Sequence, residues 1–188
     1  MDASIRALIA LGSNLGDRVG HFGAARQALT ATPGVSVVAA SRIYETDPVG
    51  PPGQGPYLNA VLALDTRLSP SALLTRLLAI EAERGRVRDR DAERWGPRPL
   101  DLDLLLYGDL CRVEAGLEIP HPRLHQRAFV LEPLCEVAGE GRHPRSGVAL
   151  AVLRERVADP VAVRPFTAAG SAWSVGATQA LGETGDDC

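Results

Sequence analysis

The chain has 188 residues, of which 45% are apolar, and a formal net charge of −3. This length favours a single domain whose core needs no disulfide or metal to support it. The weak negative charge gives no indication of a nucleic-acid or membrane partner, so we expect a monomer that acts on small molecules.

The chain contains no lysine, and this limits the kinds of phosphate site it can form. A P-loop requires lysine, so any phosphate site must use arginine, backbone N–H groups and metal. The three cysteines, Cys111, Cys135 and Cys188, are widely spaced and predict neither a zinc site nor a disulfide framework. The apolar run Ala7 to Leu11 is too short for a signal peptide or a membrane span. We therefore expect a reduced, cytoplasmic protein.

The first half of the chain predicts strands that alternate with two helices. The expected elements are a strand at 5–11, a helix from the cap Asp17 to about 31, a strand at 35–40 that continues to 46, a strand at 57–64, and a helix from Ser69 to about 84. A loop rich in proline and glycine, 47–56, precedes the third strand.

The second half predicts a strand from residue 101, a brief strand at 117–119, a rigid corner at 120–122, and helices at 129–137 and 148–157. We expect one domain over residues 1–165 and a mobile tail over 166–188. The order of elements indicates an α+β sandwich of the ferredoxin-like kind, with a largely antiparallel sheet and helices packed on one face. The other face would be free for ligand.

Asp101 and Asp103 alternate with Leu100, Leu102 and Leu104. A period of two places both carboxylates on one face of a strand and the leucines on the other. Two such carboxylates suit Mg²⁺, which takes one or two carboxylates together with phosphate oxygens and water. Salt bridges to nearby arginines explain the pair equally well, so the spacing leaves both interpretations open.

Arginines alternate with acidic residues between Arg84 and Arg98, just before this strand. Guanidinium groups bind phosphate oxygens in pairs, and several beside a metal suit a polyphosphate. The alternative is a solvated loop whose charges neutralise one another. Arg86 and Arg88 point the same way on an extended backbone, and Arg94 and Arg98 lead directly into the aspartates, which favours the phosphate interpretation.

Three further features have both a functional and a structural interpretation. Gly12 to Gly16 lie between a strand and a helix, but they lack the full GxGxxG spacing, and a tight turn capped by Asp17 is favoured. Glu81 extends the apolar stripe of its helix and could order an arginine, accept from a ligand hydroxyl, or simply end the helix. His121, between two prolines, could donate to phosphate or serve as a surface residue.

A dispersed set of aromatic and amide residues suits a flat heterocycle with hydrogen-bonding edges. Its members are Thr46, Tyr57, Asn59, Trp95 and Phe129. Tyr57 and Asn59 share a strand face. Each member taken by itself also fits an ordinary core position.

Several short motifs occur together in a fixed order. They are GSNLG at 12–16, YET at 44–46, YLN at 57–59, RWGPR at 94–98, LDLD at 100–103, PHPR at 120–123 and RAF at 127–129. Together they resemble the 6-hydroxymethyl-7,8-dihydropterin pyrophosphokinase family of folate biosynthesis. The resemblance implies a ferredoxin-like enzyme that uses ATP and two Mg²⁺ ions. It implies transfer of the ATP diphosphate to the pterin hydroxymethyl group, with release of AMP.

The resemblance also implies roles for individual residues. Asp101 and Asp103 would bind both metals and would form the catalytic set together with Arg86 and Arg98. The residues implied for ATP are Glu81, Arg86, Arg88, Trp95, Arg98, Leu104, His121 and Arg127. The residues implied for the pterin are Thr46, Asp47, Val49, Tyr57, Asn59, Trp95 and Phe129.

Two other functions compete with this one. A ferredoxin-like module that binds RNA predicts exposed aromatics on adjacent strands and a basic face, and the aspartate pair argues against it. Another Mg²⁺-dependent transferase with the same Asp-x-Asp pattern leaves the aromatic and amide set unexplained.

Overall fold

The computed structural model describes residues 4–48, 53–86, 96–157, 161–167 and 173. Val49, Arg88 and Trp95 lie outside these residues, so their roles stay predictions. Within the described ranges, no helix combines the length and the apolar character needed to cross a membrane.

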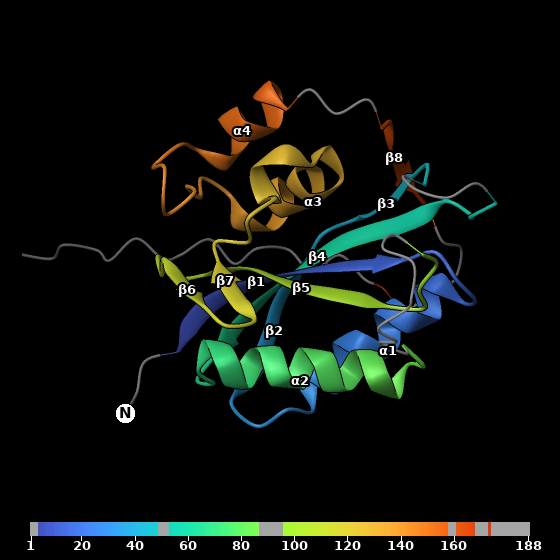
Figure 1. Cartoon of the computed structure of the whole chain (residues 1–188), viewed down its shortest axis with the longest axis horizontal. Helices are drawn as coiled ribbons and strands as arrows, with labels where there is room; N and C mark the ends of the chain where they lie inside the picture. Colours follow the sequence, from blue (N-terminus) through green and yellow to red (C-terminus); the bar gives the residue numbers. More distant parts are fainter. Residues whose placement is uncertain (1–3, 49–52, 87–95, 158–160, 168–172, 174–188) are drawn as a thin grey trace, which may run out of the picture.

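An antiparallel sheet forms the middle layer of the molecule (Figure 1). Within the described residues its six strands are β1 (Ile5–Ser13), β2 (Val35–Ala40), β3 (Ile43–Thr46), β4 (Tyr57–Thr66), β5 (Asp101–Tyr107) and β8 (Val163–Phe166). The strand order is β5-β1-β4-β3-β8, and β2 pairs with the part of β4 that β3 does not reach. β4 is apolar along most of its length because both of its faces are covered.

Helices α1 (Arg18–Thr30) and α2 (Pro70–Glu83) cover one face of the sheet (Figure 1). The predicted caps are confirmed: Asp17 accepts a hydrogen bond from the Gly20 amide at 2.9 Å, and Ser69 accepts one from the Ala72 amide at 3.2 Å. Each cap satisfies an amide that the first helical turn leaves without a partner.

Helices α3 (Ala128–Ala138) and α4 (Leu150–Arg156) lie on the opposite face of the sheet (Figure 1). The α+β class and the antiparallel sheet are confirmed, but the expectation that helices cover only one face is wrong. Leu131 and Leu134 of α3 belong to the buried cluster that contains Val61 of β4. Since β4 is apolar on both sides, its second face also needs a covering layer.

The aspartate strand has the alternation that the sequence predicts, but only over its first half. Leu102 and Leu104 lie in the core cluster beneath α2, while Asp101 and Asp103 point to the other face. The pairing with β1 then shifts by one residue, because Leu8 pairs with Leu106 and Ile9 with Leu104. Leu105 is thus the extra residue of a bulge.

A hairpin of β6 (Arg112–Glu114) and β7 (Leu117–Ile119) follows β5, and a single turn of 3₁₀ helix, η1 (Leu124–Gln126), precedes α3. Residue 116 of the hairpin turn is glycine with φ of 80°, a conformation that disfavours side chains. Further along, Phe166 pairs with Ile43 as the last residue of β8, and Trp173 is only 7% exposed. The sequence placed both residues in a mobile tail, so they have a defined place that it did not anticipate.

Candidate active site

The functional residues from three strands share the face of the sheet on which α3 lies. Gly12 of β1 pairs with Asn59 of β4 on one side and with Asp101 of β5 on the other. Directly opposed residues of antiparallel strands point to the same face. The amide of Asn59 and the carboxylate of Asp101 therefore stand two strand spacings apart, about 10 Å, with no side chain between them.

Asp101 is held by two arginines. Arg86 and Arg98 both donate to its carboxylate, the latter at 3.0 Å. Burial opposes ionisation of Asp101, but the charges of Arg86 and Arg98 outweigh burial and hold its pKa below the usual value. The carboxylate is therefore ionised at neutral pH.

Asp103 differs from its neighbour, although only one residue separates them. Burial, together with the negative charge of Asp101, raises the pKa of Asp103 to about 6. Nevertheless about two-fifths of this side chain is exposed. A carboxylate that ionises with difficulty but can be reached from solvent is suited to gain a cation.

Arg86 owes its position to the end of α2. The Arg86 amide donates to the Glu81 carbonyl, and the Gly85 amide donates to the Ala82 carbonyl, which together form a Schellman motif. Gly85 has the positive φ, 85°, that this motif requires. The turn brings Arg86 back over its own helix and toward Asp101.

Glu81 fixes both Arg86 and the start of β5. Its carboxylate, 1% exposed, accepts from the guanidinium of Arg86 and, at 2.7 Å, from the Leu102 amide. Of the roles that the sequence left open for Glu81, ordering an arginine is the one observed. Its contact with ATP stays a prediction.

His121 approaches the aspartates from the loop before α3. Its Nε2 lies 3.9 Å from a carboxylate oxygen of Asp103, and its Nδ1 accepts from the Arg123 amide at 3.2 Å. Burial and the positive charge of Arg127 lower the pKa of His121 to about 4. The ring is thus neutral at pH 7 with its proton on Nε2, where it can donate to an anion.

The other half of the site is a polar pair beside an aromatic ring. The Asn59 amide donates to the Thr46 hydroxyl at 3.0 Å, and both residues are buried. Burial raises the pKa of Tyr57, whose hydroxyl donates to the Gly96 carbonyl at 3.3 Å. Tyr57 therefore links this half to the segment that carries Arg98.

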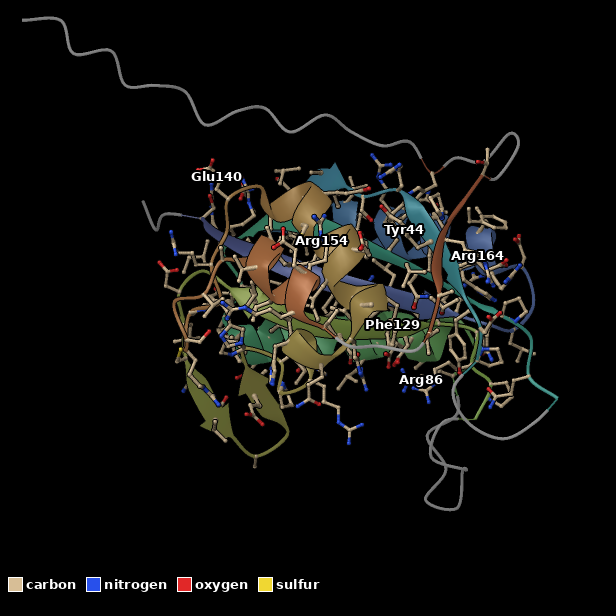
Figure 2. The ribbon with its side chains drawn as sticks, turned by 90° about the horizontal axis from the view of Figure 1, so that it is seen from above. Tyr44, Arg86, Phe129, Glu140, Arg154 and Arg164 are labelled. Atoms are coloured by element: carbon tan, nitrogen blue, oxygen red, sulfur yellow. The ribbon has the colours of Figure 1, made fainter. Side chains whose placement is uncertain are left out.

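Phe129 lies at the start of α3 with the Arg127 guanidinium 5.5 Å from the centre of its ring. Figure 2 labels both Phe129, which lies in α3, and Arg86, which follows α2 on the opposite face of the sheet. Asp47 is exposed and pairs with Arg164 at 2.8 Å. Leu104 is buried in the core beneath α2, and its expected contact with the nucleotide stays a prediction.

Asn14 has a role that the sequence did not reveal. Its side chain accepts from the Arg98 amide at 2.8 Å and donates to Gln54 at 3.0 Å, while its own amide donates to the Arg98 carbonyl. The turn at residues 12–16 thus does more than start a helix. Asn14 ties the Arg98 segment to the loop before β4, and the only signal in the sequence was an amide side chain in a tight turn.

The donor set suits magnesium better than a transition metal. Among the residues that the structure describes, no group of three or more His, Cys, Asp or Glu side chains is arranged to hold a metal ion. The carboxylates of Asp101 and Asp103 can supply two ligands, which leaves the other positions to phosphate and water, as Mg²⁺ prefers. The residues therefore fit Mg²⁺ that arrives with a polyphosphate.

The fold and this site define an α+β protein in which guanidinium groups and a carboxylate pair come together on one face of an antiparallel sheet. Residues 8–139 match the family described as 7,8-dihydro-6-hydroxymethylpterin-pyrophosphokinase. The chain belongs to this family, and the resemblance inferred from its motifs is confirmed.

Curated relatives carry the corresponding name. The 2-amino-4-hydroxy-6-hydroxymethyldihydropteridine pyrophosphokinase of Methylorubrum extorquens is 47% identical over 133 residues, which are 71% of this chain and 82% of that protein. The protein of the same name from Pseudomonas aeruginosa is 47% identical over 139 residues, 74% of this chain and 84% of the relative.

Solved structures agree with the fold. The wild-type HPPK-DHPS of Plasmodium falciparum with pteroate has a TM-score of 0.65 at 13% identity, over 82% of this chain and 45% of that one. The present chain thus spans less than half of that larger protein, and at this identity the likeness supports the fold alone.

Gly12 can be tested as the open position between the two halves of the site. A methyl group at Gly12 would meet Asp101 Cβ at 3.7 Å, an ordinary contact, so Gly12→Ala should fold with stability within about 1 kcal/mol of wild type. The methyl group would nevertheless project between Asn59 and Asp101. We expect kcat/KM for the reaction proposed below to fall by at least about tenfold, since small displacements of reacting groups are costly.

The matched control is Gly23→Ala, because a Cβ at this position of α1 meets nothing within 4 Å. This variant should keep full activity. Thermal unfolding measures stability for both proteins, and initial rates measure activity. Full activity of Gly12→Ala would contradict an open position.

Asp103 provides a test through pH. Its folded pKa of about 6 lies above the unfolded value of 3.8, so between these pH values the folded state binds more protons and the free energy of unfolding decreases as pH rises. After allowance for its exposure, Asp103→Asn should stabilise the metal-free protein by about 1 kcal/mol at pH 7 and by about nothing at pH 3.5.

Urea denaturation in EDTA at the two pH values measures this difference. Asp65→Asn is the control, because Asp65 pairs with Arg6 at the surface and is not part of the site. A loss of stability for Asp103→Asn at pH 7 would show that the carboxylate serves the fold and not a ligand.

Proposed function

We propose that this protein transfers the diphosphate of ATP to the hydroxymethyl group of 6-hydroxymethyl-7,8-dihydropterin and releases AMP, a reaction of folate synthesis. Membership of the family supports the reaction. The observation that carries the proposal at residue level is the pairing of Gly12 with both Asn59 and Asp101. With the Asn59 amide and the Asp101 carboxylate on one sheet face, the amide would bind the heterocycle and the carboxylate would direct the phosphates.

The pterin would lie on the Asn59 side of Gly12. The amides of a pterin edge match the buried Asn59–Thr46 pair, and the flat ring would stack between Tyr57 and Phe129. We also assign Asp47, Val49 and Trp95 to this half by the resemblance to the family. The hydroxymethyl group would then face β5.

The triphosphate would lie over the start of β5. Asp101 and Asp103 would hold two Mg²⁺ ions. These ions would neutralise the charge of the triphosphate and orient it for in-line attack. Arg86, Arg98 and Arg127 would hold phosphate oxygens, and neutral His121 would donate from Nε2. Glu81, Arg88, Trp95 and Leu104 complete the assigned nucleotide contacts.

The reaction needs position and charge more than covalent help from the protein. The hydroxymethyl oxygen forms a bond to the β-phosphorus while the bond from that phosphorus to the α–β bridging oxygen breaks. AMP leaves with the bonding electrons, and the hydroxyl proton passes to solvent. Because binding holds the two substrates in line, the entropy cost of bringing them together no longer adds to the reaction barrier. Preset guanidinium groups stabilise the charge on the transferred oxygens without reorganising.

The proposal includes a monomeric protein in the cytoplasm that binds no nucleic acid. The free cysteines Cys111 and Cys135 agree with a reducing compartment. The net charge of −3 agrees with small-molecule substrates. Light scattering and filter binding to RNA check the first and last of these statements.

The test is incubation of the protein with ATP, Mg²⁺ and the reduced hydroxymethylpterin, followed by separation of the nucleotides. We expect AMP to form in an amount equal to the pterin diphosphate, and only when the pterin is present. EDTA should abolish the reaction, and Asp103→Asn should reduce kcat by about a hundredfold or more, the usual effect of removing a group that stabilises transition-state charge.

Arg6→Ala is the matched control for the charged variants, since Arg6 forms an exposed ion pair with Asp65 outside the site. It should keep wild-type rates. Formation of ADP in place of AMP would mean transfer of a single phosphoryl group, and AMP without pterin would mean hydrolysis; either result would overturn the proposed reaction.

A further inference from the structure

Two parts of the C-terminal region lie against strand β3, beyond residues 8–139 that match the family. The first is β8, whose residues Val163 and Phe166 pair with Thr46 and Ile43. The second is Trp173, which is buried beside α1. We call β8 and Trp173 together the C-terminal anchor.

Trp173 holds the residue that precedes β3. Its indole N–H donates to the Ser41 carbonyl at 2.8 Å, and its ring packs against Phe22 with 5.6 Å between centroids. Ser41 is fully buried, and its hydroxyl accepts from the Val61 amide at 2.9 Å. Trp173 therefore fixes the start of β3 against the central strand of the sheet.

β8 pairs with the edge of β3 that faces away from β4, as far as Thr46 at its C-terminal end. Without it, β3 would present unpaired N–H and C=O groups at the edge of the sheet. Arg164 of β8, labelled in Figure 2, pairs with Asp47 just after β3. Both side chains are more than half exposed, so this pair contributes little. The backbone pairing and the indole thus account for most of the restraint.

Phe166 adds a contact to the loop before β4. The Arg18 guanidinium lies 5.7 Å from the centre of the Phe166 ring. The same guanidinium donates to Glu45 of β3 at 3.1 Å and to the Pro56 carbonyl at 2.8 Å. β8 therefore also supports the residue that leads into Tyr57.

Both strands restrained in this way carry the pterin half of the site. Thr46 of β3 accepts from Asn59 of β4, and the pair can present a fixed edge only if the two strands keep their register. The ATP half differs, because Asp101, Arg86 and Glu81 are held by bonds within β5 and the end of α2, whereas the indole hydrogen bond and the strand pairing of the anchor go to Ser41 and β3. Loss of the anchor should therefore affect one substrate and not the other.

We propose that Trp173, together with β8, is a positioning element for the pterin half of the active site, acting through Ser41 and β3. This inference rests on the proposed function. Trp173 touches no substrate in this assignment, so its effect is on the affinity for the pterin and not on the chemical step.

The test compares Trp173→Ala and Trp173→Phe with wild type in the AMP assay, using the full chain. For Trp173→Ala we expect the KM for the pterin to rise on the order of tenfold while the KM for ATP changes less than about twofold. Trp173→Phe keeps a ring but lacks the N–H donor, and the pterin KM should rise by about fivefold or less. Amide hydrogen exchange over residues 41–47 should be fastest in Trp173→Ala, slower in Trp173→Phe and slowest in the wild-type protein.

Val35→Ala controls for lost stability. Val35 is buried in the same core, but it pairs with Thr66 at the end of β4 remote from Asn59. It should lower the melting temperature and leave both KM values unchanged. If Trp173→Ala does not fold, Trp173→Phe decides the matter, because it keeps an aromatic ring against Phe22 while it removes the N–H donor and the smaller part of the ring volume.

The outcomes separate this inference from the function on which it rests. Equal shifts of both KM values, no shift in either, or the same pattern in Val35→Ala would overturn the role of Trp173 while the reaction stands. A wild-type protein that forms no pterin-dependent AMP would overturn the reaction, and the positioning role with it.

Discussion

The carboxylates of Asp101 and Asp103, with one residue between them, lie on the same face of β5 and repel each other. The rest of the site follows from how their negative charge is balanced. Asp101 is neutralised by Arg86 and Arg98, which keep it ionised. Asp103 receives no comparable compensation, and its pKa is raised. The fold thus neutralises one carboxylate and leaves the other more costly to ionise.

The groups that balance Asp101 have supports of their own, and these extend into the core. Arg86 depends on the Schellman turn after α2 and on buried Glu81. The Glu81 carboxylate also accepts from the Leu102 amide at the start of β5. The apolar stripe of α2 sets the position of Glu81 because Leu77 and Ile80 are fully covered beside it. The packing of α2 on one face of the sheet therefore determines how Arg86, held by Glu81, reaches the Asp101 carboxylate on the other face.

Local patterns in the sequence predicted local structure well. The alternation at Asp101 and Asp103, the cap at Asp17 and the proline after Ser69 each depend on neighbours within a few residues, and the structure has all three. The motifs also led to the correct family. Of the two interpretations of the aspartate pair, salt bridges are observed at Asp101, which pairs with Arg86 and Arg98, and the metal site stays a prediction.

Long-range features escaped the sequence for one physical reason: each depends on which segments meet, and no local pattern encodes that. The second helical layer follows from β4 being apolar on both faces, and the bulge at Leu105 from its register with β1. Trp173 lay in a segment whose composition of small and polar residues suggested disorder, yet its own indole is buried and donates to the Ser41 carbonyl. The hydrogen bonds of Asn14 likewise join residues 40 and 84 positions away.

Asn14 also has a thermodynamic consequence. One side chain bonds both to the Arg98 segment, on the nucleotide side, and to Gln54, in the loop on the pterin side. In the proposed assignment Asn14 thus connects the two substrate sides, and order gained on one side would lower the entropy that a ligand on the other side must remove. Coupling carried in this way is reciprocal, so the factor by which bound nucleotide tightens the pterin must equal the factor by which bound pterin tightens the nucleotide.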